Sequence, residues 1–427
     1  MVENVSRTVL PNGVRVVTEN IPTVQSVSVG LWASAGSRDE EPRLRGISHF
    51  LEHMFFKGTE RRPSAKDIAD EMDALGGYLN AFTDKEFTCY YARVLSEHLP
   101  VGLDILTDML TGSLFDPDET AKERKVVLEE IKRRDDDPED MVHDLFAETI
   151  YPNHALGLPV IGSVETVSAF TPDDLRGYIA RRYGPKSLVV AAAGNLEHAQ
   201  VVELAEKMLG GLVTGEANGT LTRPIATPGK LLYSRPTEQV NFCVGVDGYG
   251  QHDAEKYPLA ILDNILGGSM GARLFQEIRE KRGLAYSVGS YSATHREGGY
   301  FAAYGGTSPE NFEECLDLVR AEFEKVRKDG VSEAELQRSK NQFRGALIMA
   351  QESMSSRMTR LGKSELYFDQ VVPLAEALAK IDAVTVADVL AVAQAILPED
   401  SSKLTIAAIG PFEEADKEAL AELEGED

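Results

Sequence analysis

The chain contains little cysteine, and its cysteines lie far apart. Only three of its 427 residues are cysteines, namely Cys89, Cys243 and Cys315. An odd number of widely spaced thiols argues against a disulfide framework and against a thiolate metal cage. The cysteine content is therefore typical of a protein from a reducing compartment.

Long hydrophobic runs are also absent. No stretch approaches the roughly 20 apolar residues that a membrane-spanning helix needs, so we expect no membrane association. Residues 1–7 contain neither an apolar signal segment nor an Arg-rich amphipathic presequence. Together these absences predict a cytoplasmic protein.

Positive charge is scarce relative to negative charge. The chain has 44 Lys and Arg against 69 Asp and Glu, which gives a formal net charge of −25. Binding of nucleic acid needs clustered cations, so nucleic acid is not an expected partner. The ordinary explanation of the acidic surplus is solubility, and the sharper hypothesis is that acidic walls attract cationic peptides.

The length of the chain indicates more than one domain. With 427 residues it is too long for a single hydrophobic core. Residues 211–229 are rich in Gly, Thr and Pro, which is typical of a linker. The sequence therefore predicts an N-terminal domain over residues 1–210 and a C-terminal domain over residues 230–427.

The second half of the sequence repeats the pattern of the first. Residues 239–246 match the strand expected at residues 25–32, and a polar loop follows each. Residues 259–267 fall where the first half carries a histidine-bearing helix, and they contain no histidine. Residues 332–351 resemble a glutamate-bearing helix of the first half. We therefore predict a duplicated α+β unit in which only one copy kept a metal site.

The histidine-bearing helix is predicted over residues 46–58, with a glycine at each end. His49, Glu52 and His53 are spaced at i, i+3 and i+4, so they share one face. Two imidazoles one turn apart can hold one metal ion, and the neighbouring carboxylate can accept a proton from water. The alternative interpretation is a partly buried polar turn with a structural role.

A third metal ligand is expected on the glutamate-bearing helix, residues 118–134. The residues expected on its buried face are Val126, Val127 and Ile131. Glu123, Val127 and Glu130 fall on one stripe of this helix, whereas Glu129 lies about 100° away. Because an inward carboxylate needs a cation, we predict Glu130 as the third ligand, with Glu123 behind it.

These motifs resemble those of the pitrilysin-type (M16) zinc peptidases. The resemblance covers essentially the whole chain and is to the short-chain branch that includes the mitochondrial processing peptidase β subunit. Residues 46–59 and 123–131 are similar to the metal motifs of that family. The resemblance implies one zinc ion per chain, with Glu52 as general base and Glu123 orienting a ligand. The implied zinc ligands are His49, His53 and Glu130.

Two further segments resemble motifs of the same family. Residues 76–83 resemble its substrate-binding edge strand, although alone they read as an ordinary hairpin. Residues 273–287 resemble its Arg…Tyr element, although alone they read as a solvated helix end. The resemblance implies that Arg279 and Tyr286 hold the peptide carbonyl and the developing oxyanion. The residues implied to contact the substrate are Phe50, Asn80, Ala81 and Phe82.

The resemblance also implies an architecture and an assembly. Two similar domains, each a mostly antiparallel sheet packed with helices, form half of a clam-like dimer that encloses short or unfolded peptides. The second chain is identical or related, and its Arg…Tyr element serves the zinc of the first. The expected function is a zinc-dependent endopeptidase, and the alternative is a non-catalytic peptide-binding or scaffold subunit. Such subunits lose a ligand or the base, whereas this sequence retains them all.

Overall fold

The computed structural model describes residues 4–213, 215 and 221–413. The chain forms two compact units, each assembled from three segments. The first unit comprises Met1–Lys132, Pro159–Thr220 and Leu347–Pro373. The second unit comprises Arg133–Leu158, Leu221–Ala346 and Leu374–Asp427. Of the predicted linker, residue 214 and residues 216–220 lie outside the described residues.

A six-stranded sheet forms the centre of the first unit, in the order β1-β2-β6-β3-β5-β4. Its strands are β1 (Val5–Val9), β2 (Arg15–Asn20), β3 (Ser26–Ala33), β4 (Tyr78–Thr83), β5 (Thr88–Leu95) and β6 (Leu188–Gly194). Strands β2 and β6 run parallel, and the other neighbours run antiparallel. The segment that resembled an edge strand is therefore an edge strand, β4.

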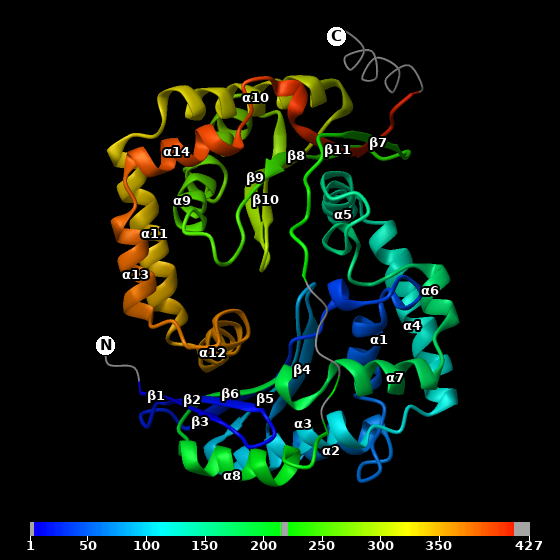
Figure 1. The fold of residues 1–427 in the computed structure, drawn as a ribbon. Coiled ribbons are helices and arrows are strands. Elements are labelled where there is room, and N and C mark those ends of the chain that lie inside the picture. The colour runs from blue at the N-terminus through cyan, green and yellow to red at the C-terminus, as the bar shows by residue number, and fades with distance from the viewer. Residues whose placement is uncertain (1–3, 214, 216–220, 414–427) are drawn as a thin grey trace. The chain divides into compact units, whose positions relative to one another are not determined.

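Helices cover both faces of this sheet. The helices of the first unit are α1 (Ile47–Met54), α2 (Ala65–Ala74), α3 (Leu99–Gly112), α4 (Pro117–Asp135), α6 (Val164–Ala169), α7 (Pro172–Arg182), α8 (His198–Leu209) and α12 (Met354–Phe368). Successive strand residues point to opposite faces, so Leu31 joins the core beneath α1 and α3 while Trp32 packs with Met358 of α12. Figure 1 shows α8 and α12 on opposite sides of the sheet.

Two buried glutamates fasten α12 to the sheet of the first unit. Glu365 of α12 has no exposed side-chain surface, and it lies 2.7 Å from Arg7 of β1 and 3.9 Å from Arg15 of β2. A second contact has the carboxylate on the sheet and the arginines on the helix. Glu19 of β2 has a side chain that is only 2% exposed. The residues of α12 that pair with it are Arg357 and Arg360. Each buried carboxylate is thus neutralised by two guanidinium groups.

The second unit repeats the topology of the first. Its five-stranded sheet has the order β7-β11-β8-β10-β9, with β7 and β11 parallel and the other neighbours antiparallel. The strands are β7 (Lys230–Ser234), β8 (Val240–Asp247), β9 (Ala285–Thr294), β10 (Gly299–Thr307) and β11 (Thr405–Gly410). Strands β7 to β11 therefore correspond in order and direction to β2 to β6. The predicted duplication, with two similar and mostly antiparallel domains, is confirmed.

In each unit, one face of the sheet is covered by a helix from the other half of the sequence. The helices of the second unit are α5 (Pro138–Ile150), α9 (Lys256–Leu266), α10 (Phe312–Asp329), α11 (Glu333–Ala350), α13 (Leu374–Ala383) and α14 (Val386–Ile396). Helix α5 packs on one face of its sheet, as α12 does in the first unit, and α9, α10 and α14 contribute to the core on the other. Residues 133–158 therefore belong to the second unit and residues 347–373 to the first, which differs from the predicted domains at residues 1–210 and 230–427.

Two local predictions differ from the structure. Helix α1 ends at Met54 and not at Gly58, because i→i+3 turns follow, with the N–H of Lys57 donating to the carbonyl of Met54 at 3.1 Å. On α4, Val127 and Ile131 are buried as predicted, but Val126 is 45% exposed. Val126 lies one residue, about 100° around the helix, from the buried Val127. Two adjacent valines in a sequence do not show which of them faces the core.

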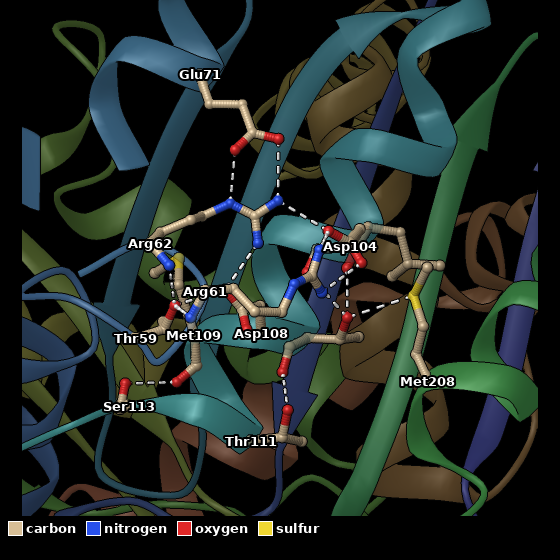
Figure 2. A network of polar contacts seen from close by, with 12 residues as sticks. Thr59, Arg61, Arg62, Glu71, Asp104, Asp108, Met109, Thr111, Ser113 and Met208 are labelled. Carbon is tan, nitrogen blue, oxygen red and sulfur yellow. Dashed lines mark hydrogen bonds and ion pairs between the residues drawn. The ribbon is translucent and has the colours of Figure 1, made fainter. Parts of the chain in front are cut away.

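A buried arginine holds the loop between α1 and α2. Arg62, only 5% exposed, donates to Glu71 at 2.7 and 2.9 Å and to Asp108 of α3 at 2.7 Å. Its Nη2, which makes one of the bonds to Glu71, also donates to Asp104 at 2.8 Å, and Thr59 donates to the same Asp108 carboxylate (Figure 2). The segment that follows α1 is thereby fixed to α3. None of the helices in the described part of the chain is long and apolar enough to cross a membrane.

The pairing of Glu365 gives a test of how α12 is held. Removing one partner of a buried ion pair costs about 3–5 kcal/mol, and Arg7 stays partly hydrated, so we expect Glu365→Ala to lose about 3 kcal/mol of unfolding free energy. Urea denaturation measures this loss. Glu376→Ala, which removes an exposed i,i+4 pair with Lys380, is the control, with an expected loss below about 0.5 kcal/mol. Equal losses of unfolding free energy in the two variants would contradict the conclusion that Glu365 holds α12 to the sheet.

Candidate metal site

Helix α1 is apolar on one side and polar on the other. Its residues with almost no exposed surface include Ile47, Phe50, Leu51 and Met54. His49, Glu52 and His53 are half-buried and share the other side, as predicted. At the start of the helix, the Glu40 carboxylate accepts the backbone N–H groups of Gly46 at 2.6 Å and Ser48 at 2.8 Å. These bonds give a partner to N–H groups that the first turn of a helix leaves without an intrahelical acceptor.

The three predicted ligands converge in the first unit. One ligand atom from each of His49, His53 and Glu130 lies within 4.8 Å of the others. Glu130 Oε2 is 3.6 Å from His49 Nε2 and 3.5 Å from His53 Nε2. Two imidazole nitrogens and one carboxylate oxygen suit a divalent transition metal and leave a coordination position open. Across the residues that the structure describes, no other group of this kind is found.

The position of Glu130 follows from the phase of α4. Glu123 and Val127 are 5% and 0% exposed, and Glu130 is half-buried on the same stripe. Glu129 has a side chain that is 70% exposed, and it lies 2.6 Å from Lys132 on the helix surface. The prediction that Glu130 and not Glu129 approaches the histidine pair agrees with this geometry.

A chain of polar contacts orients His53. Glu123 Oε1 lies 2.7 Å from His53 Nδ1, and Lys57 Nζ lies 2.5 Å from Glu123 Oε2. With Nδ1–H donating to the carboxylate, Nε2 keeps its lone pair for a metal. Burial raises the pKa of Glu123, but the hydrogen bonds from His53 and Lys57 outweigh it and lower that pKa below its usual value. Sequence reasoning gave Lys57 no role here, although its spacing of four from His53 was an available signal.

The two histidines differ in their protonation. Burial lowers the pKa of His49 to about 4, so its imidazole is neutral at pH 7, the form that binds metals. Burial also lowers the pKa of His53, but the hydrogen bond to Glu123 and the charge of Glu130 raise it above its usual value. A metal ion at this site would therefore compete with a proton chiefly at His53.

Glu52 lies beside the histidine pair and is held from the neighbouring strand. Thr83 Oγ1, at the end of β4, donates to Glu52 Oε2 at 2.5 Å. No other side-chain hydrogen bond to Glu52 is found among the described residues. Burial raises the pKa of Glu52, while the bond from Thr83 lowers it, and the balance is an elevated pKa. Glu52 thus offers an oxygen for a proton from a nearby water.

The predicted substrate contacts on α1 and β4 lie in different surroundings. Phe50 has no exposed surface, and its ring packs edge-on against Phe170 at 5.4 Å. Its predicted place in a substrate pocket is therefore wrong, because the ring belongs to the core. Asn80 is exposed on the edge strand, and Ala81 and Phe82 are half-buried. The ring of Phe82 lies on the α12 face of the sheet.

The predicted Arg…Tyr element lies in the second unit, where its two residues are in contact. Arg279 lies on a π-helical turn, Phe275–Glu280, and its guanidinium is 4.6 Å from the ring centre of Tyr286. The guanidinium also donates to the backbone carbonyl of Tyr286 at 2.5 Å. Tyr286 is 78% exposed, so its hydroxyl is free to reach a ligand.

Comparison with known proteins agrees with this arrangement of residues. Residues 15–164 match the model of the insulinase family, Peptidase family M16, and residues 169–343 match the model of the Peptidase M16 inactive domain. The chain belongs to the M16 peptidase family. The first match contains all the predicted metal ligands of this M16 chain, and the second contains the Arg…Tyr element.

Relatives of this M16 chain span nearly its whole length. An uncharacterized zinc protease of Streptomyces coelicolor is 43% identical, covering 97% of this chain and 91% of the relative. The uncharacterized zinc protease YmxG of Bacillus subtilis is 42% identical, covering 95% of this chain and 99% of the relative. The crystal structure of a protease from Helicobacter pylori has a TM-score of 0.89 at 22% identity, covering 96% of this chain and 100% of that one. That similarity supports the fold.

The metal site can be tested with two adjacent glutamates. We expect Glu130→Gln to reduce the metal content of the purified protein severely, because an amide is a much weaker ligand than a carboxylate. Glu129→Gln, one residue away on the exposed side of α4, should bind metal as the parent does. Elemental analysis after dialysis against Zn²⁺ measures both. Equal metal content in the two variants would contradict the ligand assignment.

Proposed function

We propose that this chain is a zinc-dependent endopeptidase that hydrolyses short or unfolded peptides. The observation that carries the proposal is the convergence of His49, His53 and Glu130 beside the Glu52 carboxylate. Family membership supports peptide hydrolysis, and the zinc proteases among its relatives support zinc as the metal. When bound to these ligands, one zinc ion per chain supplies Lewis acidity toward water and the scissile carbonyl.

Glu52 acts as the general base and then as the general acid. Its carboxylate accepts a proton from the attacking water while the water oxygen bonds to the scissile carbon. The same proton passes from Glu52 to the departing amine nitrogen as the C–N bond breaks. The elevated pKa of Glu52 suits both transfers, because it lies closer to neutral pH than that of a solvated carboxylate.

Neighbouring residues prepare the ligands and the peptide. Glu123, held by Lys57, keeps the His53 imidazole in the tautomer that leaves Nε2 free. The edge strand β4 has a neighbouring strand on one side only and can add an extended peptide as a further strand on the other. Asn80 Oδ1, which accepts the N–H of Ala81 at 2.8 Å, would then give way to a carbonyl of the peptide. An extended backbone is required for this pairing, so folded proteins are excluded.

We further propose that a second chain completes the site in a clam-like dimer. Arg279 and Tyr286 present a guanidinium and an exposed hydroxyl, the groups that stabilise a developing oxyanion. In the dimer these groups of one chain serve the zinc site of the other. A homodimer is the simplest assembly, because one chain contains both parts.

The general base is tested by an isosteric substitution. We expect Glu52→Gln to lose about 10²–10⁴-fold in kcat on a quenched peptide, since that is the usual contribution of general acid–base catalysis. Its zinc content should equal that of the parent. Glu60→Gln, at an exposed site after the same helix, is the control and should remain active. Full activity of Glu52→Gln would contradict the proposal, and an inactive parent that binds zinc would favour the scaffold role.

Mixed dimers test whether Arg279 acts across two chains. Glu52→Gln and Arg279→Ala should each be inactive alone, and their co-expression should restore about a quarter of parental activity, from one complete site in each mixed dimer. Co-expressed Glu52→Gln and Glu130→Gln chains are the control. They should stay inactive, because each chain lacks either the general base or a metal ligand. Failure of the first pair to recover activity would place the function of Arg279 within its own chain.

A further inference from the structure

We propose that Thr83 is a positioning residue for Glu52, and that it links the peptide-binding edge strand to the general base. The inference rests on the proposed function. It concerns a contact within the first unit, between the last residue of β4 and helix α1.

The geometry makes Thr83 a rigid hydrogen-bond donor. Leu79 and Ala81 pack on the α1 face of the sheet, so Thr83, two residues further along β4, points to the same face. Its backbone is fixed by pairing with Thr88 of β5 and by the adjoining turn, where the N–H of Asp84 donates to Phe87 at 2.8 Å. A β-branched side chain has few rotamers, so the hydroxyl is held in place.

The bond leaves one oxygen of Glu52 available. Oε2 accepts the Thr83 hydroxyl at 2.5 Å, which restrains rotation of the carboxylate and leaves Oε1 to meet the proton of the attacking water. A peptide that pairs with β4 would lie along the same strand that carries Thr83. Binding of the substrate backbone and orientation of the base are therefore connected through one short strand.

The second unit contains an equivalent contact. Asp263 of α9 accepts Ser290 Oγ at 2.6 Å and Ser292 Oγ at 3.1 Å, and both serines lie on β9. Strand β9 corresponds to β4 in the repeated topology, and α9 follows β8 as α1 follows β3. A carboxylate on this helix bonded to a hydroxyl on the edge strand thus occurs in both copies. In the first copy, that carboxylate stands beside the metal ligands and becomes the base.

The experiment compares Thr83→Val, which removes the hydroxyl, with Thr83→Ser, which keeps it. We expect Thr83→Val to lower kcat about 10–100-fold, the scale of a misplaced catalytic group, with KM and zinc content close to those of the parent. Thr83→Ser should recover most of kcat. Ser290→Ala combined with Ser292→Ala, which breaks the equivalent contact in the second unit, is the control and should keep parental kcat.

A second readout does not depend on activity. Crystal structures of the zinc-loaded parent and Thr83→Val should contain one orientation of the Glu52 carboxylate in the parent and a rotated or multiple orientation in the variant. Parental kcat in Thr83→Val, an unchanged Glu52 orientation, or a change confined to KM would overturn the positioning role. An inactive parent with the expected change in Glu52 orientation would instead contradict the proposed function and leave the positioning of Glu52 supported.

Discussion

The burial of helix α1 is the constraint on which the rest of the site depends. Its apolar side fills the core of the first unit, so its rotation about its own axis is fixed. With that side buried, the 3.6-residue period turns His49, Glu52 and His53 together toward the opposite face. Helix α4 is held in the same way by Val127 and Ile131, and its period brings Glu130 to the two imidazoles. Hydrophobic packing of two helices thus brings the candidate metal ligands together.

The electrostatics of the cluster favour a divalent cation. Three carboxylates, those of Glu52, Glu123 and Glu130, lie close to the two imidazoles, and Lys57 is the ammonium that contacts one of them. Carboxylates that are buried or half-buried and outnumber their cations repel one another, and this raises the free energy of the metal-free protein. A divalent cation held by these ligands would offset that repulsion.

Duplication accounts for two units of the same topology, of which only the first carries the candidate metal ligands among the described residues. Both sheets have the same strand order and direction, and both carry a carboxylate–hydroxyl bond between helix and edge strand. The second copy has Asp263 on α9 in place of the metal-binding set. It carries instead the exposed Tyr286 and the half-buried Arg279 that contacts its ring. In the proposed dimer, these residues of the second unit act at the metal site of the other chain.

Helical periodicity, read from the sequence alone, determined the shared face of His49, Glu52 and His53 and the choice of Glu130 over Glu129. These are local properties, because the residues compared lie within about two turns of one helix. Tertiary structure alone decided the contacts of Lys57 with Glu123 and of Thr83 with Glu52, the burial of Phe50, and the placement of α5 and α12. Each of these depends on which segments, distant in sequence, pack together. Amphipathic patterns reveal that a surface must be covered, but not which element covers it.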